Sequence, residues 1–309
     1  MAKKVLITEE FHPSLAEELE KLGYICDQQW EATNESIQAL ISSYEILVVN
    51  SKISVNKNLL DLGIGLKCII RIGSGMEIID RQYCLEKGIH IISTPEGNAN
   101  AVAEHVLGFI LSAYHNMYRA QSEMIEGLWR RESNRGEELC GKILAIIGCG
   151  NTGTRLAKLI AGFDTEVLVY DLVDIRERIV HTKAKQVRMK EIFHRADLVS
   201  FHVPLDIGTK NLINTSYIKN FNKSIDIVNT SRGGICVLED VYAGLEQGTI
   251  QRAMMDVYEN EPFKLDNRAR ELYKSNKLFL TPHIAGWTHE SKKRMAELAL
   301  SKLNLLDLL

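Results

Sequence analysis

Residues 141–153, GKILAIIGCGNTG, decide the fold of this chain. The apolar residues Ile143–Ile147 form a short run of the kind that is buried as a parallel strand. This run leads directly into Gly148, Gly150 and Gly153, which have the spacing G-x-G-x-x-G. After a strand, the first glycine permits a tight turn, the second lets the backbone approach a pyrophosphate, and the third lets the next helix pack close to the strand. The sequence therefore predicts a strand, turn and helix that bind a dinucleotide.

Two features beyond the glycines support a dinucleotide site. The predicted helix opens at Asn151 and Thr152, so its free amides and partial positive charge are available to phosphate. The next predicted strand, EVLVYD, ends in Asp171, at the place where an acid accepts hydrogen bonds from the ribose hydroxyls. The same carboxylate repels a 2′-phosphate, and Leu172 follows it where an arginine would favour NADP. We therefore expect NAD as the cofactor.

Short apolar runs alternate with helical patterns along the whole chain. A helical stretch over residues 98–125 separates two sets of runs, and another helix is predicted over residues 77–87, closed by Gly88. Such alternation predicts open parallel sheets with right-handed crossovers and helices on both faces. We therefore predict an α/β protein with two doubly wound parallel sheets. The predicted strands are residues 5–8, 24–26, 46–49, 67–70 and 89–92 in the first set, and residues 143–147, 166–170, 198–201, 225–228, 252–255 and 278–280 in the second.

The composition excludes several classes of protein. Hydrophobic residues make up 45% and charged residues 25% of the 309, which is ordinary for a folded chain and unlike a disordered one. A net charge of −3 provides no positive field for nucleic acid or an anionic membrane. The sequence shows no secretory signal, no apolar run of membrane-spanning length, no C-x-x-C pair among six cysteines and no cluster with metal-ligand spacing. We expect a cytoplasmic protein without a metal.

Three polar side chains follow late strands of the second predicted sheet, where open α/β sheets bind ligands. Arg232 follows DIVNTS, and its planar guanidinium matches a carboxylate. Glu261 lies in DVYENEP, and His283 lies directly after a strand in LFLTPHIAGW. Each residue alone is also typical of a solvated or packed position, but adjacent strand ends would bring them together. Local contexts that suggest packing or surface positions give less weight to His105, His115, His202 and His289.

Several motifs then occur in a characteristic order. They are RIGSGMEIID at residues 71–80, TPEGNANAVAEHVLGFIL at 94–111, the glycine motif, HVPL at 202–205, NTSRGG at 229–234, DVYENEP at 256–262 and TPHIAGWT at 281–288. With these motifs, nearly the whole chain resembles the D-isomer-specific 2-hydroxyacid dehydrogenases, and most of all the short phosphoglycerate dehydrogenases. The resemblance implies that a Rossmann NAD domain, residues 98–281, is inserted into a flavodoxin-like substrate domain formed by residues 1–97 and 282–309.

The resemblance also implies catalytic roles. His283 would be the general acid and base that exchanges the proton of the C2 hydroxyl while hydride passes between C2 and the nicotinamide. Glu261 would hold that imidazole and favour its protonated form. Arg232 would bind the substrate carboxylate and polarise the 2-oxo group.

Further residues of the substrate and cofactor sites come from the same resemblance. Arg71 and the backbone amides near Ser74 and Gly75 would complete the substrate site. The residues implied at the cofactor site are Gly148, Gly150, Asn151, Thr152, Gly153, Asp171, Val203, Thr230, Ser231 and Asp256.

The sequence leaves the substrate open. The first choice is 3-phosphoglycerate, an intermediate of serine biosynthesis, with hydroxypyruvate or glyoxylate second. Arg71 lies where phosphoglycerate enzymes carry a cation, but Asn50 stands where they carry an arginine, and Trp287 would narrow the pocket. The competing class is a non-catalytic NAD-sensing protein that resembles corepressors of this family.

The resemblance also implies a homodimer, formed through the hinge helix and the segment after it. Additional positive charge near this hinge comes from Arg130, Arg131 and Arg135. These arginines would serve a phosphoryl group across the dimer interface, or would form an ordinary solvated charge run. We expect no appended regulatory domain.

The proposed ribose contact can be tested directly. Asp171→Ala should weaken NADH binding much more than NADPH binding, because it removes a ribose acceptor and also the repulsion of the 2′-phosphate. Fluorescence titration with each cofactor measures both affinities. Equal losses for the two cofactors would contradict the role of Asp171.

Overall fold

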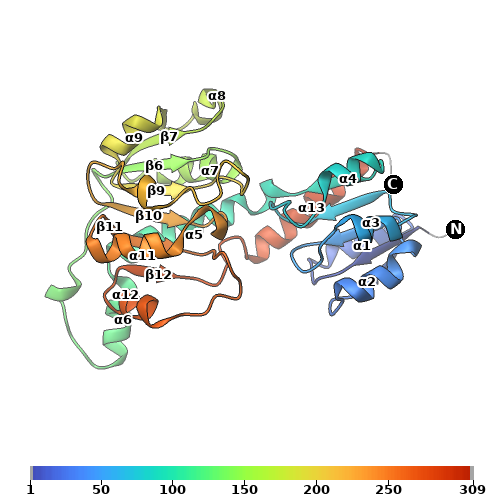
Figure 1. Ribbon diagram of the computed structural model, residues 1–309, viewed down its shortest axis with the longest axis horizontal. Helices are drawn as coiled ribbons and strands as arrows, with labels where there is room; N and C mark the ends of the chain where they lie inside the picture. The colour runs from blue at the N-terminus through green and yellow to red at the C-terminus, as the bar shows by residue number, and fades with distance from the viewer. Residues whose placement is uncertain (1–2, 307–309) are drawn as a thin grey trace. The chain divides into compact units, whose positions relative to one another are not determined.

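The structure, a computed structural model, describes residues 3–306 and divides into two compact units. One unit comprises Met1–Asn98 and Trp287–Leu309, and the other comprises Ala99–Gly286. Each unit contains one sheet whose strand pairs are all parallel (Figure 1). This confirms the predicted α/β class with two parallel sheets. No helix among the described residues combines the length and the apolar character that crossing a bilayer requires.

The sheet of the first unit has the strand order β2-β1-β3-β4-β5. This is the flavodoxin-like order, in which the direction of winding reverses between β1 and β3. Ligands of such sheets bind beyond the carboxyl ends of the strands at that reversal. The strands are β1 (Lys4–Ile7), β2 (Ile25–Gln28), β3 (Ile46–Val49), β4 (Cys68–Arg71) and β5 (His90–Ser93), and the helices between them are α1 (Ser14–Lys21), α2 (Asn34–Leu40), η1 (Ile41–Ser43), α3 (Lys57–Leu62) and α4 (Arg81–Glu86).

Alternating residues of these strands pack into two apolar clusters, one on each face of the sheet. In β1, Val5 and Ile7 belong to the cluster that contains α1, whereas Leu6 belongs to the cluster that contains α2, α3 and α4. The last helix, α13 (His289–Asn304), completes the first cluster with Met295 and Leu303. The chain therefore returns to its first unit after it has built the second one.

The second unit has a sheet of seven strands in the order β12-β11-β10-β9-β6-β7-β8. Numbered within the unit, this is the Rossmann order with one further strand, and its winding reverses between β6 and β9. The strands are β6 (Ile143–Ile147), β7 (Glu166–Tyr170), β8 (Lys185–Gln186), β9 (Leu198–Phe201), β10 (Ile225–Asn229), β11 (Ile250–Met255) and β12 (Leu278–Leu280). The helices that lie wholly in this unit are α6 (Met117–Ile125), η2 (Glu132–Asn134), α7 (Asn151–Ile160), α8 (Arg176–Ile179), α9 (Met189–Arg195), α10 (Thr215–Ile218), η3 (Gly233–Ile235), α11 (Leu238–Gln247) and α12 (Asn267–Lys274).

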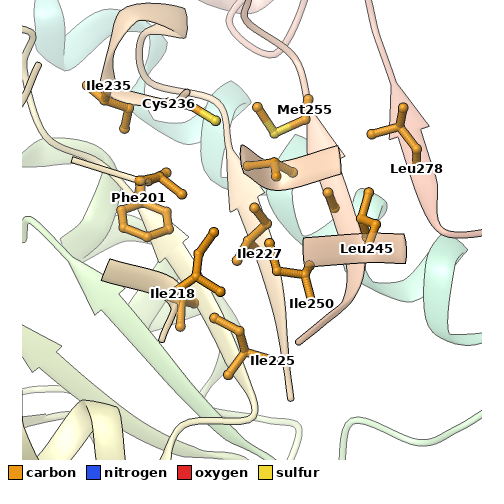
Figure 2. Packing of buried hydrophobic residues seen from close by; sticks show 14 of the residues in the cluster. Phe201, Ile218, Ile225, Ile227, Ile235, Cys236, Leu245, Ile250, Met255 and Leu278 are labelled. Carbon is orange, nitrogen blue, oxygen red and sulfur yellow. The ribbon is translucent and has the colours of Figure 1, made fainter. Parts of the chain in front are cut away.

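Both faces of this sheet are covered. In β6, Ala145 and Ile147 join the cluster under α9 to α12, and Leu144 and Ile146 join the cluster that contains α7 and α5 (Pro95–Tyr114). Figure 2 shows part of the first of these clusters, with side chains from β9, β10, β11 and β12 packed among residues of α10 and α11. This double cover explains why the strands are apolar runs with no alternation of polar residues.

Two predicted helices differ from the structure, and one short strand has no counterpart among the predicted ones. The predicted helix over residues 98–125 is two helices, α5 and α6, because Asn116 adopts a left-handed φ of 53° between them. The predicted helix over residues 77–87 begins only at Arg81, since Ile79 forms a parallel bridge with Val55 and the Asp80 side chain caps the helix. The second sheet has a seventh strand, β8, which is two residues long.

The second boundary between the units also falls later than we expected. The sequence predicts it after residue 281, whereas the second unit extends to Gly286. Hydrogen bonds from Ile284 and Ala285 to Asp256 hold these residues in the second unit. The assignment of the units to substrate and cofactor stays a prediction.

A partly buried imidazole after β9 makes a pH-dependent contribution to stability. Burial lowers the pKa of His202 from 6.5 to about 4, while its Nε2 lies 2.9 Å from the Ser200 hydroxyl. Because the unfolded chain binds this proton more readily than the folded protein, the free energy of unfolding decreases as the pH falls from about 6.5 towards 4.

Glutamine at this position keeps a polar group near Ser200 and does not titrate. Between about pH 7.5 and about pH 5, His202→Gln should therefore lose about 2 kcal/mol less unfolding free energy than the parent protein. Urea denaturation at the two pH values measures this difference. The same pH dependence in both proteins would show that His202 is not buried in its neutral form.

Candidate functional site

The three glycines of the β6–α7 turn are required for different physical reasons. Gly148 has a φ of 88°, and a Cβ there would lie 2.6 Å from the carbonyl oxygen of His202. A Cβ on Gly153 would lie 2.2 Å from the carbonyl oxygen of Gly148. A Cβ on Gly150 would meet no atom within 4 Å. The first and third glycines thus allow close packing, and the second leaves an open side where a ligand can approach the backbone.

Asp171, which follows β7, is fixed beside this turn. Its Oδ2 accepts a hydrogen bond of 2.7 Å from the backbone N–H of Cys149, and its Oδ1 accepts one of 3.2 Å from Val173. The next residue, Leu172, is 89% exposed. The carboxylate therefore has a defined position next to the glycine turn, and an apolar side chain stands beside it.

Two observations fit a dinucleotide at the carboxyl edge of this sheet. Helix α7 begins after Gly150, which has no side chain to cap it, so its first amides are available to a phosphate. The hydroxyl of Thr230, directly after β10, is buried and has no hydrogen-bond partner among residues 3–306. A buried hydroxyl without a partner is costly. A cofactor that reached this edge would satisfy both groups.

The turn that carries Arg232 is held by a buried amide. Asn229, the last residue of β10, is fully buried. Its Oδ1 accepts hydrogen bonds from the backbone N–H and the hydroxyl of Ser231, and its Nδ2 donates to the carbonyl oxygen of Arg232. The backbone on both sides of the guanidinium-bearing residue is thereby fixed.

Gly233 links this turn to the loop after β11. A Cβ at Gly233 would lie 1.9 Å from the carbonyl carbon of Tyr258, so only glycine fits. The structure therefore packs the Arg232 turn directly against the loop that carries Glu261.

His283 and Glu261 are in direct contact. The Nδ1 of His283 lies 2.7 Å from Oε2 of Glu261. The other carboxylate oxygen accepts a hydrogen bond of 3.0 Å from the backbone N–H of Tyr258. Because an ionised carboxylate only accepts hydrogen bonds, Nδ1 of His283 carries a proton and Nε2 remains for a ligand. The His283 side chain is 51% exposed, as a group that exchanges protons with a bound molecule requires.

Tyr258 ties this pair to the sheet. It is only 9% exposed, and its hydroxyl lies 3.0 Å from the carbonyl oxygens of both Met255 and Thr281. Its ring stacks on Phe263 with 4.1 Å between the centroids. Tyr258 therefore joins the end of β11 to the residue after β12, close in the chain to Glu261 and His283.

Asp256 is fully buried, and within residues 3–306 its carboxylate accepts hydrogen bonds from the segment around His283. Its Oδ1 accepts from the Thr281 hydroxyl at 2.5 Å and from the Ile284 N–H at 2.9 Å, and its Oδ2 accepts from the Ala285 N–H at 2.8 Å. The sequence predicts Asp256 as a cofactor ligand, and that role stays a prediction. The observed contacts are to the loop that presents His283.

The expected substrate residues lie in the first unit. Arg71, the last residue of β4, donates from Nε to the carbonyl oxygen of Gly75 at 2.8 Å, and from NH1 to Oδ1 of Asn50 at 2.6 Å and to the carbonyl oxygen of Ile72. Ser74 is exposed, and its hydroxyl donates to Oδ1 of Asn98 at 3.3 Å. In this arrangement Arg71 shapes the loop that contains Ser74 and Gly75.

The carboxylate of Glu9 binds the backbone directly after β3, the strand that neighbours β4. Oε1 of Glu9, which is 9% exposed, accepts hydrogen bonds of 2.7 to 3.1 Å from the backbone N–H groups of Asn50, Ser51 and Lys52. Three successive amides that face one oxygen form an anion-binding concavity. The chain fills this concavity with its own side chain, and sequence reasoning did not identify Glu9.

The structure thus brings some predicted residues together within the second unit and assigns another to the first unit. His283 and Glu261 touch, and the Arg232 turn contacts their loop, all within the second unit. Arg71 belongs to the first unit. Sequence reasoning also gave little weight to His105, whose Nε2 lies 3.1 Å from the Thr281 hydroxyl. The signal that would identify it is its place in the motif at residues 94–111.

Comparisons with known proteins identify the family of this chain. Residues 107–285 match the D-isomer specific 2-hydroxyacid dehydrogenase, NAD binding domain. A hydroxypyruvate reductase from Thermotoga maritima is 33% identical over 87% of this chain and 88% of its own length. A D-3-phosphoglycerate dehydrogenase from Methanocaldococcus jannaschii is 32% identical over 94% of this chain, which spans only 55% of that relative. A glyoxylate reductase from Paecilomyes thermophila has the same fold, with a TM-score of 0.88 at 23% identity over 98% of this chain and 94% of its own.

Proposed function

Because this chain belongs to the D-isomer specific 2-hydroxyacid dehydrogenase family and is NAD-dependent, we propose that it reduces a small unphosphorylated 2-oxo acid such as hydroxypyruvate. The matches confirm the family, the enzyme class and the cofactor that the sequence predicts. The observation that carries the proposed chemistry is the contact of 2.7 Å between His283 and Glu261. When bound, the cofactor supplies or accepts hydride at the C2 carbon of the substrate.

In the direction of reduction, His283 acts as the general acid. Its Nδ1–H is held by Glu261, so Nε2–H donates the proton to the carbonyl oxygen at C2 as that oxygen gains negative charge. After the transfer, Nδ1 retains its proton, and the neutral imidazole stays in the tautomer that Glu261 selects. In the direction of oxidation, the same Nε2 accepts the proton of the C2 hydroxyl.

Arg232 binds the carboxylate of the substrate in this proposal. A guanidinium pairs with a carboxylate through two parallel hydrogen bonds, which fixes the orientation of the 2-oxo group. Rigidity of the turn supports this role, because Asn229 and Gly233 hold the backbone on either side of Arg232. A fixed donor costs no reorganisation when charge develops on the substrate.

The state of Arg71 favours an unphosphorylated substrate. Asn50 and two backbone carbonyls use three of the hydrogen-bonding directions of this guanidinium, and a guanidinium has only five N–H groups. A phosphoryl group would have to compete with these contacts. Two of the other arginines considered for phosphate are also paired within the chain, Arg130 with Glu123 and Arg135 with Glu132.

The second candidate substrate is 3-phosphohydroxypyruvate, the oxidised form of 3-phosphoglycerate. It is favoured by the relative from Methanocaldococcus jannaschii, of which this chain spans about half. A panel of hydroxypyruvate, glyoxylate, pyruvate and 3-phosphohydroxypyruvate with NADH distinguishes the candidates. We expect kcat/KM for hydroxypyruvate or glyoxylate to exceed that for the phosphorylated acid by about tenfold or more. A higher kcat/KM for 3-phosphohydroxypyruvate would contradict the proposal, and turnover of none would favour a protein that only binds NAD.

The general-acid assignment has its own test. His283→Gln should lower kcat for the best substrate of the panel by about 10²- to 10⁴-fold, because glutamine cannot transfer the proton. NADH affinity, measured by fluorescence, should remain close to that of the parent. His289→Gln, in the first turn of α13, is the matched control and should keep full activity. Unchanged turnover in the His283 variant would refute the mechanism.

We further propose that a second copy of the chain covers helix α6 and the segment after it. No residue of α6 is buried, although several of its residues are large and apolar. Ile125 is 80% exposed, and Met117, Tyr118 and Met124 are exposed on the same helix. In the segment after the helix, Trp129 is 75% exposed. Apolar side chains gathered on one element mark protein interfaces. A symmetric dimer would bury this face of both copies.

Light scattering tests the dimer. The parent protein should have the mass of two chains, and the double variant Ile125→Glu, Trp129→Glu should have the mass of one, since each copy would place charge in the interface. Ile64→Glu, at a position that is 86% exposed in the first unit, controls for the change in charge. A monomeric parent protein would rule out the dimer.

A further inference from the structure

We propose that His105 is a positioning residue for the reaction: from α5, its imidazole donates a hydrogen bond to Thr281, which also binds Asp256, and thereby fixes the loop that carries His283. This inference rests on the role proposed for His283. Within residues 3–306 His105 contacts Thr281, Asp256 and Phe109 rather than Glu261 or His283, so it would act only through the loop.

The direction of each hydrogen bond in this chain of contacts follows from Asp256. Its buried carboxylate can only accept, so the Thr281 hydroxyl donates its hydrogen to Oδ1 of Asp256 over 2.5 Å. The oxygen of that hydroxyl is then an acceptor for Nε2 of His105, which lies 3.1 Å away. Nε2 of His105 also lies 3.9 Å from Oδ1 of Asp256. The network therefore selects the tautomer in which Nε2 of His105 carries the hydrogen.

The imidazole is held in place for this contact. Its side chain is only 20% exposed, and it meets the ring of Phe109 edge to face, with 4.6 Å between the centroids and 77° between the planes. Burial lowers the pKa of His105, and the nearby charge of Asp256 opposes that effect. A neutral imidazole has one N–H group, and here it is directed to Thr281. An apolar residue would fill the same space without making this bond.

His283 has an unfavourable backbone conformation, which hydrogen bonds to the neighbouring residues must maintain. Its φ of 57° is left-handed, which costs a non-glycine residue roughly 1–2 kcal/mol and persists only where its surroundings enforce it. Asp256 binds Ile284 and Ala285 after His283. Before His283, Thr281 is bound at its hydroxyl by Asp256 and His105, and at its carbonyl oxygen by Tyr258.

The loss of the His105 donor would therefore loosen the loop on one side of His283. Thr281 would keep its bond to Asp256, but its hydroxyl oxygen would have no donor, and its side chain could rotate to find another partner. His283 would then spend less time in the position from which it donates to the substrate. This lowers kcat, whereas the cofactor site at the β6–α7 turn, built by Gly148 and Asp171, is unaffected.

A matched pair of variants tests this inference. His105→Gln keeps an N–H donor near the position of Nε2, and His105→Leu keeps bulk but removes the donor. We expect His105→Leu to lower kcat about tenfold, the effect of one hydrogen bond, with KM for the 2-oxo acid and the Kd of NADH nearly unchanged. His105→Gln should restore most of the lost kcat. Combining His105→Leu with Thr281→Val should lower kcat no further than Thr281→Val alone, because both changes break the same connection.

Hydrogen exchange provides a readout that does not depend on turnover. The amides of Ile284 and Ala285 donate to Asp256, so they should exchange about tenfold faster in His105→Leu than in the parent, and at nearly the parent rate in His105→Gln. Equal kcat and equal exchange in the parent and His105→Leu would overturn the inference. Equal losses in both variants would also overturn it, since the imidazole would then serve packing alone. A parent protein that turns over no 2-oxo acid would instead refute the proposed function, while the exchange rates would still decide whether His105 tethers the loop.

Discussion

The geometry of the second unit's site depends on one buried carboxylate. Asp256 follows β11 and is removed from solvent, where an ionised group without partners would cost several kcal/mol. Its partners are one hydroxyl and two amides of the segment 281–285. Because the charge must be satisfied, that segment closes over the end of β11. His283 lies in the middle of the segment and takes its position from this closure.

The same edge of the sheet brings the other candidate site residues together. The strands β10, β11 and β12 are neighbours and parallel, so the loops after them leave the sheet side by side. The Arg232 turn follows β10, Glu261 follows β11, and His283 follows β12. Contacts between the loops then set the fine geometry: Gly233 packs on the backbone of Tyr258, whose hydroxyl reaches the carbonyl oxygen of Thr281. Topology therefore supplies proximity, and a few buried polar contacts supply orientation.

The sequence predicts most of the strands because buried parallel strands are continuous apolar runs. The predicted bounds of β3, β6, β7, β9 and β12 are those of the structure. The misses have local causes. The break between α5 and α6 depends on the left-handed backbone of Asn116, and no glycine or proline marks it. Strand β8 is two residues long and pairs only with β7, so it carries no apolar pattern.

The sequence predicts the residues that carry the chemistry of the candidate site, but it does not predict the buried contacts that hold them in place. Motifs predict Arg232, Glu261 and His283 as site residues, because each follows a strand end and has a side chain suited to one chemical task. No pattern shows that Asp256 binds residues 28 and 29 positions further along the chain. Nor does any pattern show that His105 meets Thr281, 176 positions away. Such contacts exist only after the sheet has formed, so helical and strand periodicity cannot reveal them.

In the first unit, the residue at position 50 decides which groups bind the guanidinium of Arg71. At the end of β3, three successive amides surround the carboxylate of Glu9, which holds the backbone of Asn50 in place. The amide oxygen of Asn50 then accepts from Arg71, and Arg71 binds the carbonyl oxygens of its own loop. An arginine at position 50 would repel Arg71 and leave both cations in need of an anion. Asparagine satisfies Arg71 from within the protein. The loop with Ser74 and Gly75 is thereby shaped by an internally balanced network, in which Glu9, Asn50 and Arg71 satisfy one another and the backbone around them.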